Sequence, residues 1–214
     1  MRSIFRAARR AGFAPAHMVW LPGAFHTPED FLAAGFAVAV RDRGIDLDLE
    51  FVQLELEHVG DRRIIGRLAR DVVAPARARG CRAIWIAGIS LGGLFALDYA
   101  AGGAGEWDGL CLLAPYLGNR LLITEIMQAQ SVAAWQPGPL AESDEERRIW
   151  RFAQMRRSEP RALYLGYGRD DRFAQAHGLL AQTLPADAVD VVPGGHDWQT
   201  WLTLWERFLE ARFT

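Results

Sequence analysis

The segment 82–93 constrains the fold of this chain most, because a strand, a sharp turn and a helix follow one another there. The apolar run 83–87 leads directly into the pattern Gly88-x-Ser90-x-Gly92. Glycines two residues before and after Ser90 remove side chains that would collide around a strained turn. Ser90 would then project its hydroxyl from the end of a sheet as a nucleophile. The alternative is a glycine-rich turn in which Ser90 is an ordinary helix N-cap.

Apolar runs alternate with helical patterns along the rest of the chain. About six strands are predicted, near 17–21, 45–51, 83–87, 109–114, 161–167 and 188–192. Helical spacing lies between and after them, over 28–43, 61–79 and 172–184 and from Trp198 onward. This alternation predicts an α/β fold, a three-layer α/β/α sandwich around a mostly parallel sheet. In 45–51 apolar and acidic residues alternate, which predicts a strand near the sheet edge with one face in water.

The chain is predicted to form a single domain over residues 17–214. Residues 1–16 are rich in arginine and alanine, and we expect them to form an N-terminal tail. Residues 117–160 contain no strand pattern, and a segment of this length in a compact domain is usually a functional cover. We therefore expect 117–160 to form a small helical cap over Ser90.

Composition argues against several classes of function. The 24 lysine and arginine residues are all arginine, which excludes a Schiff-base lysine, a pyridoxal-phosphate anchor and a P-loop. A net charge of -2 does not indicate the basic surface that a nucleic-acid-binding protein needs. No apolar run is long enough to span a membrane and no signal-peptide core is visible, so we expect a cytoplasmic protein without a membrane partner. Neither Cys81 and Cys111 nor the scattered histidines have metal-ligand spacing, and no metal is expected.

Three loops that follow predicted strands carry the residues of a candidate catalytic site. In an open parallel sheet, ligands bind outside the carboxyl ends of the strands, where these loops would hold Ser90, Asp170-Asp171 and His196. A nucleophilic serine needs a base to take its proton and an acid to orient that base. We favour Asp171 as the acid, because it must turn inward while Asp170 could cap the helix that begins near Arg172.

With these residues, the chain resembles the α/β-hydrolase superfamily from about His17 to its C-terminus. Gly88-Ile89-Ser90-Leu91-Gly92-Gly93 is similar to the serine turn of the esterase branch. Gly194-Gly195-His196-Asp197-Trp198, followed by Trp201, resembles the histidine loop of esterases of the esterase D and enterochelin-esterase kind. In the family the acid commonly stands three residues after the strand-end glycine, which from Gly168 is Asp171. Two departures from the family are visible. Pro22-Gly23 stands in place of His-Gly, and there is no pattern for the first antiparallel strands; the second departure implies a compact variant.

The resemblance implies a serine hydrolase that cleaves a small-molecule ester or thioester through an acyl-enzyme, without a metal or organic cofactor. Backbone amides of Leu91 and Ala24, with Phe25 as substitute, would bind the oxyanion; an ordinary β-turn is the alternative for Pro22-Gly23-Ala24. The candidates for the substrate pocket are Phe25, His26, Tyr116, Met127 and Trp135. Core or lid packing is the alternative for Tyr116, Met127 and Trp135, and a surface position for His26. An acyltransferase or amidase with the same triad, or a non-catalytic binding module on this scaffold, are the alternative functions.

Overall fold

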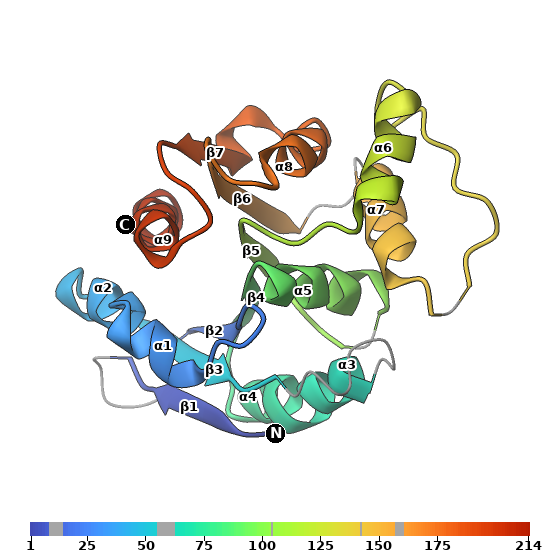
Figure 1. Ribbon diagram of the computed structural model, residues 1–214. Coiled ribbons are helices and arrows are strands. Elements are labelled where there is room, and N and C mark those ends of the chain that lie inside the picture. The colour runs from blue at the N-terminus through green and yellow to red at the C-terminus, as the bar shows by residue number, and fades with distance from the viewer. Residues whose placement is uncertain (9–14, 55–62, 104, 142, 157–160) are drawn as a thin grey trace.

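A single mixed sheet forms the centre of the computed structural model (Figure 1). The structure describes residues 1–8, 15–54, 63–103, 105–141, 143–156 and 161–214. Within these ranges seven strands lie in the spatial order β1-β3-β2-β4-β5-β6-β7, and all pairs are parallel except β1 with β3. The strands are β1 (Ser3–Arg6), β2 (Ala16–Leu21), β3 (Leu47–Val52), β4 (Ala83–Ile89), β5 (Gly109–Leu113), β6 (Ala162–Gly168) and β7 (Val189–Val192).

The order of the strands places a ligand site next to β2. The chain first continues to β3 on one side of β2, and β4 then pairs with β2 on the opposite side. At such a switch point the connections leave the sheet in opposite directions, and the loops at the carboxyl ends separate. The loop that follows β2 and the turn at Ser90 after β4 border this position.

Helices cover both faces of the sheet (Figure 1). On one face lie α1 (Pro28–Ala33), α2 (Phe36–Asp42) and α9 (Trp198–Phe213). The other face carries α3 (Arg63–Leu68), α4 (Ala74–Ala78), α5 (Leu91–Ala101), α6 (Arg120–Gln128), α7 (Glu145–Met155) and α8 (Ala174–Ala181). A π-helical turn (Ala69–Val73) joins α3 to α4, and a 3-10 turn (Ala186–Ala188) precedes β7. The predicted three-layer α/β/α sandwich is therefore confirmed.

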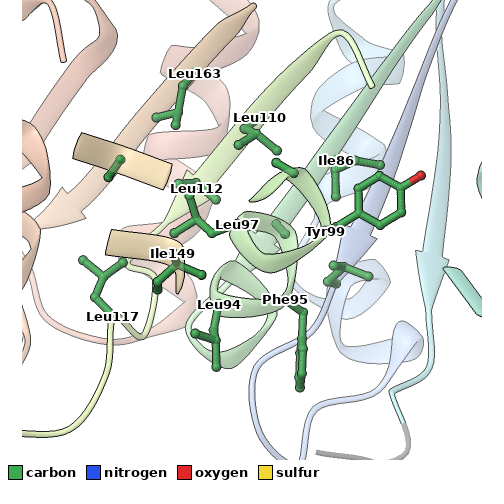
Figure 2. Packing of buried hydrophobic residues seen from close by; sticks show 14 of the residues in the cluster. Ile86, Leu94, Phe95, Leu97, Tyr99, Leu110, Leu112, Leu117, Ile149 and Leu163 are labelled. Atoms are coloured by element: carbon green, nitrogen blue, oxygen red, sulfur yellow. The ribbon is translucent and has the colours of Figure 1, made fainter. Parts of the chain in front are cut away.

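Helix α5 is the central element of the larger core. Figure 2 shows its side chains Leu94, Leu97 and Tyr99 among residues of the strands and of α7. Because the sheet covers one side of α5 and α7 packs against another, nearly all of α5 is buried and apolar. Its buried Asp98 accepts a 2.6 Å hydrogen bond from Nε of Arg148 on α7. The Ser90 turn thus leads directly into a buried, closely packed helix.

The sequence predicted that residues 1–16 form a tail, but part of this segment is a strand. Ser3–Arg6 pairs antiparallel with β3, so an antiparallel strand is present where the sequence showed no pattern for one. This pairing covers β3, which is buried along its whole length instead of having one face in water. Its acids are held by partners: Asp48 accepts the Ala8 N–H at 2.6 Å and Glu50 accepts the Ser3 hydroxyl at 2.7 Å. Residues 9–14 of the predicted tail lie outside the described residues.

The predicted helix 28–43 is two helices. Gly35 adopts a left-handed conformation with φ of 93°, which ends α1 and begins α2. The apolar spacing continues across this break, because both helices bury their apolar residues against the same face of the sheet. Periodicity alone could not separate the two helices.

The predicted cap contains α6 and α7, which occupy different positions. α7 packs against α5 within the helical layer, and Nε1 of Trp150 donates a 2.6 Å hydrogen bond to the Leu117 carbonyl. α6 follows the carboxyl end of β5 and stands beside α7 (Figure 1). Residues 142 and 157–160 of the predicted cap are not among those described. Because α7 belongs to the helical layer, the prediction of a cap over Ser90 now applies to α6 only. In the described part of the chain no helix is long and apolar enough to cross a membrane.

Candidate active site

Ser90 lies in a strained turn between β4 and α5. Its backbone has φ of 53° and ψ of -117°, a conformation that residues other than glycine rarely adopt. A Cβ at Gly88 would overlap the Gly92 carbonyl, and a Cβ at Gly92 would overlap the carbonyl of Leu21 on β2. Both glycines are therefore required for the turn to fit against the neighbouring strand.

His196 joins Ser90 to Asp171 through its two ring nitrogens. Nε2 lies 2.9 Å from the Ser90 Oγ, and Nδ1 lies 2.7 Å from the Asp171 Oδ2. With Nδ1 protonated, the ring donates to the carboxylate and accepts from the serine hydroxyl. Three loops that are far apart in the sequence thus bring the three predicted side chains into one hydrogen-bonded line.

Asp171 is held as a buried carboxylate. Its other oxygen accepts a 2.8 Å hydrogen bond from the Phe173 N–H, and the residue is 5% exposed. Burial alone would raise the pKa of Asp171, but the hydrogen bonds from His196 and Phe173 outweigh it and lower this pKa below its ordinary value. The carboxylate therefore stays ionised beside the imidazole and favours protonation at Nδ1.

Asp170 has a different position from Asp171. Its Oδ2 accepts the Gly194 N–H at 3.3 Å, and its own N–H donates to the Gly194 carbonyl at 2.9 Å. The prediction that this residue would cap the following helix is wrong, because α8 begins only at Ala174 and has no side-chain cap. Asp170 instead joins its loop to the loop that carries His196.

Two backbone amides near Ser90 are free to bind an anion. Within the described residues, neither the Leu91 N–H nor the Ala24 N–H donates a hydrogen bond. Gly23 to His26 also form a turn, closed by a 3.2 Å hydrogen bond from the His26 N–H to the Gly23 carbonyl. The alternative β-turn is therefore present, and it leaves the Ala24 amide free.

The candidates for the substrate pocket have different environments. Tyr116 and Met127 line a groove between α6 and α8, and their contact with a substrate stays a prediction. Trp135 is 2% exposed and packs in the core, where its Nε1 donates to Glu125, so its assignment to the pocket was wrong. Phe25 is 89% exposed, at a position where its backbone has φ of 65°.

His26 lies over Gly23, close to Ser90 and His196. A Cβ at Gly23 would be 2.9 Å from the His26 Nδ1 and 3.5 Å from the Ser90 Cβ. The ring of His26 packs against Trp198 at a centroid distance of 4.9 Å. Burial lowers the pKa of His26, with a smaller contribution from His196 in the same direction, and outweighs the opposing effect of Asp30. A neutral, half-buried imidazole thus borders the candidate site.

Comparisons with solved structures identify the fold. Fluorophosphonate-binding serine hydrolase F of Staphylococcus aureus aligns with a TM-score of 0.66 and 12% identity, over 97% of this chain and 90% of that one. A hormone-sensitive lipase from a metagenome library aligns at 0.65 and 16% identity, over 98% and 79% of the two chains. S-formylglutathione hydrolase of S. aureus aligns at 0.60 and 13% identity, over 92% and 80%.

This chain has the α/β-hydrolase fold. No protein-family model matches the chain, and no curated protein matches it in sequence. The α/β-hydrolase fold predicted from the order of Ser90, Asp171 and His196 is therefore confirmed by structure, at identities too low to transfer an activity. In the described part there is no group of three or more His, Cys, Asp or Glu side chains that could hold a metal.

Two residues around the candidate site, Phe173 and His177, were missed by sequence analysis. The ring of Phe173 packs edge-on against His196 at 5.3 Å, and Trp201 does so from another side at 5.0 Å. His177 is fully buried beneath Phe173, and its Nε2 lies 2.9 Å from the Pro115 carbonyl. Phe173 could have been found from its position, because it follows the predicted acid Asp171 by two residues. Nothing local distinguishes His177 from a core residue on an amphipathic helix.

Proposed function

We propose that this protein is a serine hydrolase that cleaves a carboxylic ester or thioester through an acyl-enzyme intermediate. The observation that supports this most strongly is the position of His196, within hydrogen-bond distance of both the Ser90 hydroxyl and the buried Asp171. A binding module has no need for a strained serine in contact with an oriented histidine. The hydrolases and esterases that share this fold add support to the class of reaction.

In the proposed reaction, Nε2 of His196 takes the proton of Ser90 while Oγ attacks the substrate carbonyl carbon. The carbonyl oxygen becomes an oxyanion, which the N–H groups of Leu91 and Ala24 bind. His196 then gives its proton to the leaving alcohol or thiol as the bond to the carbonyl carbon breaks. Water repeats these steps on the acyl-enzyme and releases the acid. Asp171 holds the imidazole in the required tautomer throughout.

The proposal is tested by covalent labelling together with turnover. Wild-type protein should react with a fluorophosphonate probe at Ser90 and hydrolyse p-nitrophenyl esters or acyl-CoAs of graded chain length. Ser90→Ala should lose both properties while keeping its thermal unfolding midpoint. Ser131→Ala, which removes a loop hydroxyl whose only described partner is the Ala134 N–H, should keep both.

Two results would overturn or redirect this assignment. Labelling or ester turnover at the wild-type level in Ser90→Ala would place the nucleophile elsewhere. Labelling at Ser90 without hydrolysis of any ester or thioester would indicate an amidase or an acyltransferase, which an added amide substrate or acyl acceptor would then reveal.

A further inference from the structure

A groove of about 700 Å³ lies between α6 and α8, beside the proposed active site. Its floor consists of the buried side chains Leu117, Ile123 and Ala176. The side chains around this floor include the aromatic residues Tyr116 and Phe173 and the charged residues Arg120 and Arg172. Its apolar floor and polar rim are suited to a narrow molecule with a charged or polar end.

Two aromatic side chains that line the groove also contact the proposed site. Phe173 packs edge-on against His196 at 5.3 Å and against Tyr116 at 5.8 Å. The backbone of Tyr116 is attached directly to the serine turn, since its N–H donates a 2.8 Å hydrogen bond to the Ser90 carbonyl. A substrate whose carbonyl lies at Ser90 can therefore extend past Phe173 into this groove.

The charged side chains that line the groove are both arginines. Arg120 is the first residue of α6, and Arg172 precedes α8 on the opposite wall, with its guanidinium 4.9 Å from the Phe173 ring centroid. In the described part of the chain neither has a carboxylate partner, whereas Arg147 and Arg148 on the adjacent α7 both do. The first turns of α6 and α8 also face the groove, and the partial positive charge of a helix N-terminus has the same sign.

Three acids lie close to the groove, and all have hydrogen-bond donors. Asp171 accepts from the N–H of Phe173 and lies against Nδ1 of His196. Glu146 accepts from the Tyr116 hydroxyl at 3.0 Å and from the N–H of Asn119 at 3.0 Å. Glu125 pairs with Arg147 and with Nε1 of Trp135. None of these three acids is among the residues that line the groove, so Arg120 and Arg172 set the sign of the charge on its lining.

We infer that this groove selects esters in which an apolar chain leads from the reacting carbonyl to a carboxylate or phosphate. Arg120 and Arg172 bind that anionic group, and the apolar floor binds the chain. This inference rests on the proposed esterase function and adds the chemical class of the substrate. The guanidinium group suits the role, because its planar N–H donors match two oxygens of a carboxylate or phosphate.

The test compares matched pairs of esters that differ only in a terminal charge. For a charge on the acyl side, the pair is mono-p-nitrophenyl adipate and p-nitrophenyl hexanoate. For a charge on the alcohol side, the pair is the acetate ester of ω-hydroxyhexanoate and hexyl acetate. The measured quantity is the ratio of kcat/KM for the anionic ester to that for the neutral ester, and the favoured pair shows which side of the substrate occupies the groove.

Wild-type protein should prefer the anionic member of one pair, and this preference should weaken as salt is added. Arg120→Gln and Arg172→Gln should each lower the ratio by up to about five-fold, the upper end of the range for exposed ion pairs, and the double variant should remove the preference. Arg151→Gln is the matched control: it removes the same charge from an exposed position on α7 outside the groove, and should leave the ratio unchanged.

The outcomes separate this inference from the proposed function. If wild-type protein turns over neither member of either pair, nor any other ester or thioester, the proposed function fails. If it turns over the neutral esters but shows no preference for an anionic one, the charge selection is wrong. A preference that persists in the double variant, or is equally reduced by Arg151→Gln, would place the anionic group elsewhere.

Discussion

Two adjacent aspartates, Asp170 and Asp171, have separate tasks at the residue scale. Asp171 is buried and bonded to the imidazole of His196, whereas Asp170 is exposed and contacts the backbone of Gly194. Burial matters here because a hydrogen bond to a charged group is stronger where water cannot compete for it. The side chain that points inward therefore controls the tautomer of the base, and its neighbour supports the loop.

Asp171→Asn should lower kcat about 10⁴-fold, since an amide leaves the imidazole in the wrong tautomer, as in the protease triad. Asp170→Asn should keep most of the activity and cost about 1 kcal/mol of stability, because it weakens only an exposed hydrogen bond. Both are measured with saturating ester substrate and by denaturant unfolding. An inactive Asp170→Asn beside an active Asp171→Asn would reverse the assignment.

At the scale of elements, the connection from β4 to α5 depends on close backbone contact. α5 begins immediately after Ser90, and its first turn lies against the carboxyl end of β2. The same contact brings the Leu91 amide near the loop that holds Ala24. The strain at Ser90 is maintained because the strands and α5 around it are buried.

Gly92→Ala should destabilise the protein by about 3 kcal/mol or more and lower ester turnover, because the added methyl group overlaps the Leu21 carbonyl. Gly178→Ala is the matched control. This glycine lies within α8, and a Cβ there would have no atom within 4 Å. It should stabilise the protein by about 1 kcal/mol, the difference in helix propensity. Equal unfolding midpoints for the two variants would show that the turn tolerates a side chain.

At the scale of the whole molecule, the interior beneath the site excludes positive charge. His177 is fully buried between Tyr167 and Phe173, and its Nε2 lies beside the Pro115 carbonyl. Burial lowers the pKa of His177 from 6.5 to about 4, although Asp171 and the Pro115 carbonyl act in the opposite direction. A smaller electrostatic contribution from His196 acts in the same direction as burial.

This pKa makes the stability of the fold depend on pH. The unfolded chain binds the proton of His177 near pH 6.5, and the folded chain only near pH 4. The neutral His177 therefore leaves the folded chain at its full stability above about pH 6.5, and the folded chain loses stability relative to the unfolded chain as the pH falls toward 4. Between pH 7 and 5, wild-type protein should lose about 2 kcal/mol more stability than His177→Gln, which cannot titrate. Parallel losses in urea unfolding would contradict the buried, neutral His177.

Local patterns in the sequence predicted six of the seven described strands and placed Ser90, Asp171 and His196 in loops that follow them. Runs such as 83–87 and 109–114 are apolar because strands covered on both faces need it, and this requirement is visible without knowing the partner strand. The elbow glycines are a local requirement of one turn. The choice of Asp171 over Asp170 needed both the family pattern and an argument about direction, and the structure places Asp171 against His196.

Tertiary structure alone decided the remaining features. β1 was not visible in 1–16, because a four-residue strand depends on pairing with β3 for its stability. Trp135 looked like a pocket residue, yet packing against α6 and α7 buries it. The groove needs Arg120 and Arg172, which are far apart in the sequence and face one another only after β5 and β6 pair. Contacts between distant segments leave no periodicity in either segment, and the folded chain is therefore required to reveal them.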